Sequence, residues 1–155
     1  MVITAKIADT VVKRLLVDTG ISCDVLFLFA LQQMGIDTRK LEESLRPLVS
    51  FMGHEAPMLG SISLTVVNRE EPKVLTTMVN LFIIDVVLAY NGILGQLSLN
   101  IIAVVVSTLH QMMKFPTWEG ISQVCNYQKE ARACYFIAIW KGGVVKACLF
   151  TRAFL

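Results

Sequence analysis

The chain has 155 residues, which suits one domain with an extension, and its formal net charge is +2. That charge is too small to predict a nucleic-acid-binding surface. Apolar residues make up 55% of the sequence and charged residues 17%. No apolar run approaches the roughly 18–20 residues that span a bilayer, and no secretory signal peptide is read. We therefore expect an intracellular, cytoplasmic protein that buries part of its apolar surface against a second chain.

Short strands dominate the predicted secondary structure. Alternating or continuous apolar runs predict strands at residues 2–7, 11–17, 24–29, 49–52, 58–64, 62–67, 74–84, 103–106 and 110–115. Helical segments are expected at residues 27–34, 37–45, 96–101 and 124–133. Repeated short strands with glycine turns predict a mainly β, closed, barrel-like fold with one or two short helices.

The charge is distributed unevenly along the chain. Residues 1–105 contain eight Lys and Arg against ten Asp and Glu, whereas residues 106–155 contain six against two. The periodic apolar pattern also ends at residues 116–120. These two changes predict a domain over residues 1–117 and a less regular C-terminal extension over residues 118–155.

A carboxylate stands at the end of a predicted apolar strand. Leu15, Leu16 and Val17 lead into Asp18, which is followed by Thr19 and Gly20. Glycine allows the backbone to turn sharply there. A carboxylate at the edge of a core is costly unless it is hydrogen-bonded or shares a proton, so Asp18 is a candidate catalytic acid.

No other constellation in the sequence predicts catalysis. Asp24 is not followed by the glycine of this motif, and Asp85 lies in an apolar strand without a turn. His54 and His110 have no Cys or Ser partner in the pattern. The four cysteines form no Cys-x-x-Cys pair, so we predict neither a metal site nor a cofactor.

Further segments extend the Asp-Thr-Gly motif into a family resemblance. The segments that carry it are Asp18-Thr19-Gly20, Gly53-His54-Glu55, residues 89–95 ending in Ile93-Leu94-Gly95, residues 105–110 and residues 113–117. In this order they resemble the retropepsin family of aspartic proteases. They are most similar to the protease region of plant gypsy-class long-terminal-repeat retrotransposon polyproteins, over roughly residues 1–138.

The resemblance implies a retropepsin-like barrel that works as a homodimer. Because the chain has one Asp-Thr-Gly, Asp18 from each of two copies would form the catalytic pair and cleave peptide bonds of a polyprotein. The resemblance also implies that Thr19 hydrogen-bonds across the dimer. The implied flap and substrate-binding residues are Phe51, Met52, Gly53, His54 and Glu55. Ile93, Leu94 and Gly95 would support the catalytic loop, and residues 118–155 would be a C-terminal extension or a polyprotein spacer.

The sequence departs from the family pattern beside the motif. Ile21 stands where a small residue is usual, and Gln96 and Leu97 replace a basic residue and a proline. The flap also lacks its usual glycine-rich approach. These departures keep a second hypothesis open, in which the chain is a catalytically inactive retropepsin-like dimerisation or protein-binding module. A third hypothesis, a spacer before a reverse transcriptase in a longer polyprotein, is compatible with either.

Overall fold

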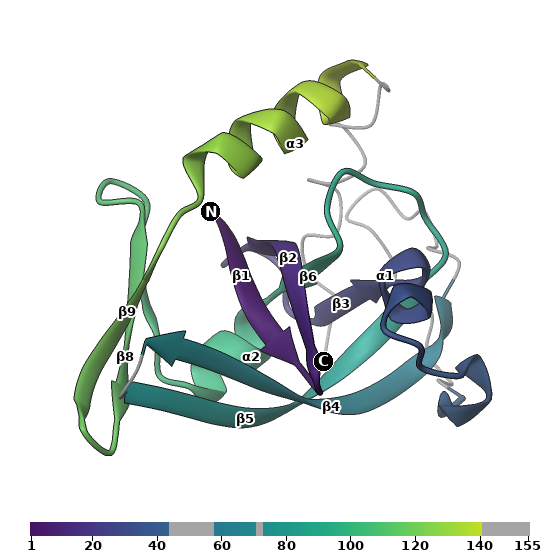
Figure 1. Cartoon of the computed structure of the whole chain (residues 1–155), viewed down its shortest axis with the longest axis horizontal. Coiled ribbons are helices and arrows are strands. Elements are labelled where there is room, and N and C mark those ends of the chain that lie inside the picture. The colour runs from purple at the N-terminus through teal and green to yellow at the C-terminus, as the bar shows by residue number, and fades with distance from the viewer. Residues whose placement is uncertain (44–57, 71–72, 141–155) are drawn as a thin grey trace.

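The computed structural model describes residues 1–43, 58–70 and 73–140. Six of the described strands close into a barrel, in the order β1-β2-β6-β3-β5-β4, as Figure 1 shows. The barrel strands are β1 (Val2–Ile7), β2 (Thr10–Val17), β3 (Asp24–Phe27), β4 (Met58–Glu70), β5 (Lys73–Ile84) and β6 (Gly92–Leu94). The structure therefore confirms the predicted mainly β, closed barrel.

Two antiparallel hairpins form most of the barrel wall. In β1–β2, Ile7 pairs with Thr10 across a two-residue turn. Strands β4 and β5 pair from Met58 opposite Ile84 to Glu70 opposite Lys73, with a register shift at Gly60. The prediction of two strands between residues 58 and 67 was wrong, because the pairing with β5 runs without interruption from Gly60 to Glu70 and makes one strand.

The short strand β6 holds the strands on either side of the Asp18 loop together. It pairs in parallel with β2 and antiparallel with β3. Residues 92–94 were not among the predicted strands, because a strand of this length carries no visible periodicity. A Cβ on Gly92 would lie 2.7 Å from the carbonyl oxygen of Val25. Glycine therefore permits the close approach of β3 and β6.

A second sheet closes one end of the molecule. It has the order β7-β8-β9, formed by β7 (Val105–Ser107), β8 (Met112–Thr117) and β9 (Gly120–Cys125). Met113 and Phe115 of β8 are fully buried against the barrel core. Strand β9 was not predicted. The proposed domain boundary at 117/118 falls in the turn of the β8–β9 hairpin, and the two-domain division stays a prediction.

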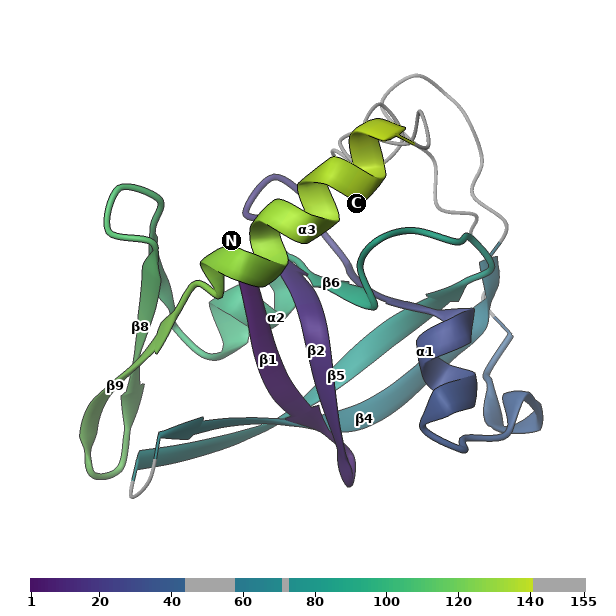
Figure 2. The ribbon, with the colours of Figure 1, turned by 45° about the horizontal axis from the view of Figure 1, so that its top comes forward.

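The described part of the chain contains three α-helices, α1 (Leu28–Gln33), α2 (Gln96–Ile101) and α3 (Gln128–Trp140), and a 3₁₀ turn at Thr38–Lys40. The helix predicted at residues 124–133 begins later, because β9 extends to Cys125. Helix α3 crosses over β1 and β2, as Figure 2 shows. Cys134 of α3 is buried, and its thiol donates a hydrogen bond to the carbonyl oxygen of Ala89 at 3.4 Å. Among the described helices, none combines the length and apolarity needed to cross a membrane.

Among the described residues, the buried apolar side chains form two clusters. The larger one fills the barrel and reaches the β7–β9 sheet. The smaller one gathers residues of the Asp18 loop, β3, β5 and β6: Ile21, Cys23, Val25, Phe27, Ile84 and Ile93. Burial of this second cluster anchors the loop that follows Asp18 to the barrel wall.

Candidate active site

The Asp-Thr-Gly motif forms the start of the loop between β2 and β3. The Asp18 amide donates to the carbonyl oxygen of Leu94 at 3.0 Å. The Gly20 amide donates to Asp18 Oδ1 at 2.9 Å. These two bonds fix the backbone and one carboxyl oxygen of Asp18, which is half-buried in the single chain. Thr19, next to it, is exposed.

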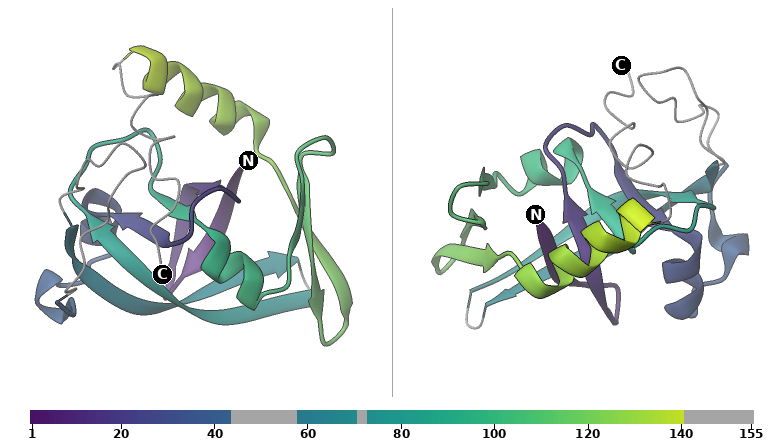
Figure 3. Two further views of the ribbon diagram at one scale, coloured as in Figure 1. Left: turned by 180° about the vertical axis from the view of Figure 1, so that it is seen from behind. Right: turned by 90° about the horizontal axis from the view of Figure 1, so that it is seen from above.

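The segment after β6 lies directly behind this loop. Figure 3 shows the purple loop that follows β2 beside α2. The Gln96 amide donates to the carbonyl oxygen of Ile21 at 2.7 Å, and Gln96 Nε2 donates to the carbonyl oxygen of Thr19 at 2.8 Å. The structure thus brings Asp18, Thr19 and Gly20 together with Leu94 and the residues that follow it. Support of the loop by Ile93, Leu94 and Gly95 was predicted, and its importance for activity stays a prediction.

Gly95 is pressed against the backbone of the loop. A Cβ at this position would overlap the carbonyl oxygen of Cys23 and lie 2.6 Å from that of Ile21. Real Cβ atoms do not approach oxygen so closely. Glycine is therefore required at Gly95 for the segment and the loop to touch.

Two of the departures from the family pattern have clear positions. Ile21 is fully buried and packs in the smaller apolar cluster with Val25 and Ile93. Gln96 uses its side-chain amide to hold Thr19, as described above. Neither side chain therefore prevents the loop from forming. The predicted flap residues Phe51, Met52, Gly53, His54 and Glu55 lie outside the described residues.

Asp24, which the sequence analysis set aside as a catalytic candidate, is part of this site. Its carboxylate accepts hydrogen bonds from the Gly95 amide at 2.7 Å, the Ser98 amide at 3.1 Å and the Ser98 hydroxyl at 2.6 Å. Burial raises the pKa of the Asp24 carboxyl, and the hydrogen bonds from Ser98 and Gly95 offset part of that increase. The sequence did contain a signal that Asp24 is structurally important: it is an acid within an apolar run, and a buried acid requires hydrogen-bond donors.

The thiol beside Asp24 stays protonated at neutral pH. Burial, reinforced by the negative charge of Asp24, raises the pKa of Cys23 to about 11. A thiol with so high a pKa is a poor nucleophile at neutral pH, since the thiolate is the reactive form. The loop therefore contains no cysteine suited to nucleophilic catalysis.

The raised pKa of Asp24 predicts a pH-dependent contribution to stability. Above the ordinary carboxyl pKa of 3.8 and below the folded-state value, the folded chain retains a proton that the unfolded chain has released. The free energy of unfolding therefore falls as pH rises through this interval. We expect Asp24→Asn to remove this part of the slope in urea unfolding measured across the interval. A difference between the two proteins that does not vary with pH would contradict this expectation.

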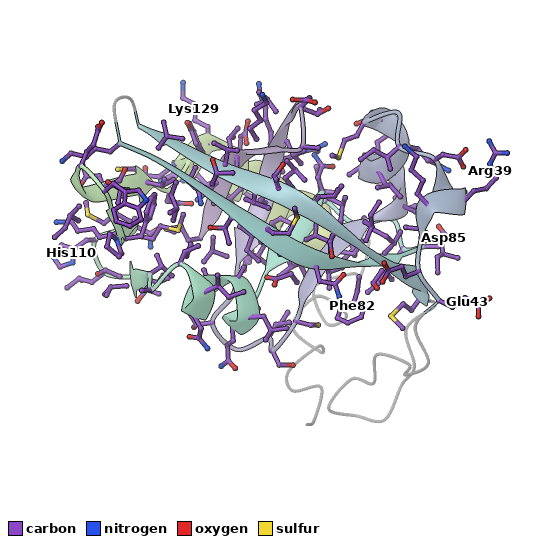
Figure 4. The ribbon with its side chains drawn as sticks, turned by 90° about the horizontal axis from the view of Figure 1, so that it is seen from below. Arg39, Glu43, Phe82, Asp85, His110 and Lys129 are labelled. Carbon is purple, nitrogen blue, oxygen red and sulfur yellow. The ribbon has the colours of Figure 1, made fainter. Side chains whose placement is uncertain are left out.

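The other titratable candidates lie apart from one another. Figure 4 shows His110 and Asp85 at opposite ends of the molecule. His110 is exposed in the turn between β7 and β8, and its Nδ1 is 2.8 Å from Ser107 Oγ. The prediction that His110 has no Ser partner was therefore wrong, because the turn between β7 and β8 brings residues 107 and 110 together. Asp85 is exposed directly after β5. Within residues 1–43, 58–70 and 73–140, no three His, Cys, Asp or Glu side chains gather as metal ligands.

The structure of the chain is similar to those of known proteins. The retroviral protease-like domain of Ddi1 from Leishmania major is similar with a TM-score of 0.56 and 16% sequence identity, over 81% of this chain and 91% of that chain. A retropepsin-like aspartic protease from Rickettsia conorii is similar with a TM-score of 0.50 and 19% identity, over 79% of this chain and 80% of that chain. No protein-family model and no curated protein sequence matches the chain. The chain therefore has the fold of the retropepsin-like aspartic proteases.

Proposed function

We propose that the chain is one half of an aspartic endopeptidase that is completed by a second copy of itself. The observation that carries this proposal is the Asp18 loop. Its carboxyl is held by the Gly20 amide, its backbone is tied to Leu94, and the sequence contains one Asp-Thr-Gly. The two structurally similar proteins support it, since one is a retroviral protease-like domain and the other a retropepsin-like aspartic protease.

The proposed chemistry requires two adjacent carboxyl groups. When the Asp18 side chains of two copies meet on a two-fold axis, electrostatic repulsion prevents both from being ionised, so they share one proton. This proton sharing is general to aspartic proteases. The ionised partner accepts a proton from a bound water, and the protonated partner donates to the carbonyl oxygen of the peptide bond. Water is the nucleophile, so no acyl-enzyme forms.

The surface next to the loop favours association with a second copy. Exposed apolar side chains stand on α2, which lies behind the loop, and on strands β7 and β9; they are Leu97, Ile101, Val105 and Ile121. Exposed apolar surface of this kind is typical of protein interfaces. In a two-fold dimer the same residues from both copies would face each other. Thr19, exposed in the single chain, would then reach the partner loop.

We further propose that the substrate is a polyprotein of a gypsy-class retrotransposon. This rests on the sequence segments that resemble the protease region of such elements, with residues 118–155 as the following spacer. The alternative is a catalytically inactive dimerisation or protein-binding module. Ile21 favours it, because a large side chain replaces the usual small residue directly after Asp-Thr-Gly.

Turnover and oligomeric state together decide between the two functions. We expect the purified chain to sediment as a dimer and to cleave a peptide library at mildly acidic pH, with inhibition by a statine-containing peptide. Statine mimics the tetrahedral intermediate of water attack, so it binds a working carboxyl pair more tightly than a substrate does. A stable dimer without turnover would instead establish the binding module.

A further inference from the structure

Both ends of the Asp18 loop are attached to the same segment, Leu94–Ser98. At the start of the loop, the Asp18 amide donates to the Leu94 carbonyl oxygen. In the middle, the Gln96 amide donates to the Ile21 carbonyl oxygen. At the end, the Asp24 carboxylate accepts hydrogen bonds from the amides of Gly95 and Ser98. The position of Leu94–Ser98 therefore determines the position of the whole loop.

The buried position of Asp24 is energetically unfavourable for a carboxylate. It is 1% exposed, and no Lys or Arg among the described residues forms an ion pair with it. A buried carboxylate without a cation is unfavourable unless hydrogen bonds replace its hydration. Its hydrogen-bond donors come from Gly95 and Ser98, 71 and 74 residues away in sequence. A hydrophobic residue would fill this buried position without the cost of desolvating a carboxylate. We therefore attribute the presence of Asp24 to the hydrogen bonds that it accepts from Gly95 and Ser98.

We propose that Asp24 is a positioning residue for Asp18. It holds Gly95 and Ser98 against the end of the loop, and the adjacent Leu94 carbonyl then fixes the Asp18 backbone from the same segment. Displacement of a catalytic group by about 1 Å can cost on the order of 10²-fold in rate. This inference rests on the proposed protease function, because it assigns Asp24 to the geometry of the same site.

Two serines provide a matched test of this connection. Ser98 is 3% exposed and Ser122 is 1% exposed. The Ser98 hydroxyl donates to Asp24, whereas Ser122 Oγ, on β9, has no hydrogen-bond partner among the described residues. Ser98→Ala and Ser122→Ala therefore remove the same atom from equally buried positions. They differ in whether the Asp24 connection is broken.

The first readout is kinetic. We expect Ser98→Ala and Asp24→Asn to lower kcat per folded dimer by about tenfold or more, with KM within about twofold of wild type. Ser122→Ala should leave both parameters unchanged. The concentration of active sites is measured by titration with a statine-containing peptide. A loss of folded protein therefore does not change the kcat calculated per site. If Ser98→Ala and Asp24→Asn retain the wild-type kcat per site, the inference is wrong.

The second readout does not require activity. Amide hydrogen exchange measures the Asp18 amide, which bonds Leu94, and the Gly20 amide, which bonds the Asp18 carboxylate. We expect Ser98→Ala and Asp24→Asn to accelerate exchange at both amides, while amides of the β8–β9 hairpin keep their wild-type rates. If the two variants show faster exchange at both amides but the wild-type chain cleaves no peptide, only the protease function is overturned. Unchanged exchange at Asp18 and Gly20 would overturn the role of Asp24.

Discussion

Asparagine in place of Asp18 is expected to abolish peptide cleavage and to leave the fold and the dimer intact. An amide cannot accept a proton from the bound water, and it cannot share the single proton of the carboxyl pair. Positioned acid–base groups contribute about 10²–10⁴-fold to rate, so at least this much of kcat should be lost. The Gly20 amide can still donate to the side-chain oxygen of the new residue, because this bond requires only an acceptor.

A second aspartate provides the control for this substitution. Asp9 lies in the turn between β1 and β2 with a fully exposed side chain, at the other end of β2 from Asp18. Asp9→Asn changes the net charge by the same amount and should keep wild-type kcat and KM. The measurement is cleavage of a peptide substrate, with dimer formation checked by sedimentation. Undiminished cleavage by the Asp18 variant would refute the assignment of Asp18 as the catalytic acid.

Alanine in place of Gly95 is expected to destabilise the whole chain. The added Cβ would overlap the Cys23 carbonyl oxygen and approach that of Ile21, and both are backbone atoms that cannot rotate away. Relief of this overlap requires the Asp18 loop and α2 to separate, which also breaks the bond from Gly95 to Asp24. We expect a loss of about 3 kcal/mol or more in the free energy of unfolding, measured by urea denaturation.

Gly35 allows the steric effect to be separated from the general cost of replacing glycine. No atom lies within 4 Å of a Cβ built on Gly35, although its φ of +70° disfavours alanine. Gly35→Ala should therefore cost only about 1 kcal/mol, from the left-handed backbone conformation. Equal losses at Gly95 and Gly35 would show that the contact between Gly95 and the loop is unimportant for stability.

Local sequence patterns were sufficient for the elements that pair with their neighbours in the chain. Strands at residues 2–7 and 11–17 were predicted from their apolar pattern, and a helix was predicted at residues 96–101; β1, β2 and α2 form there, and β1 pairs with β2. These features depend on side-chain periodicity and turn geometry, which residues close in sequence determine.

Elements that depend on distant partners were not recovered from the sequence. Strand β6 is too short to show a period, and it is a strand only because β2 and β3 flank it. Strand β9 was missed for a different reason, since it pairs with its chain neighbour β8: its buried residue is the polar Ser122 and Ile121 is exposed, so no apolar alternation marks the strand. In both cases the backbone hydrogen-bond partners, rather than local propensity, decide the conformation.

The sequence by itself determined that a carboxylate, Asp18, stands at the end of an apolar strand in an Asp-Thr-Gly turn. Only the tertiary structure decided what holds that turn in place. Closure of the barrel brings residues 94–98 against residues 18–24, and Asp24 then finds its donors on Gly95 and Ser98. A burial pattern along the chain reveals that Asp24 needs partners, but not which ones, because hydrogen bonds across 71 residues arise only when the strands have paired.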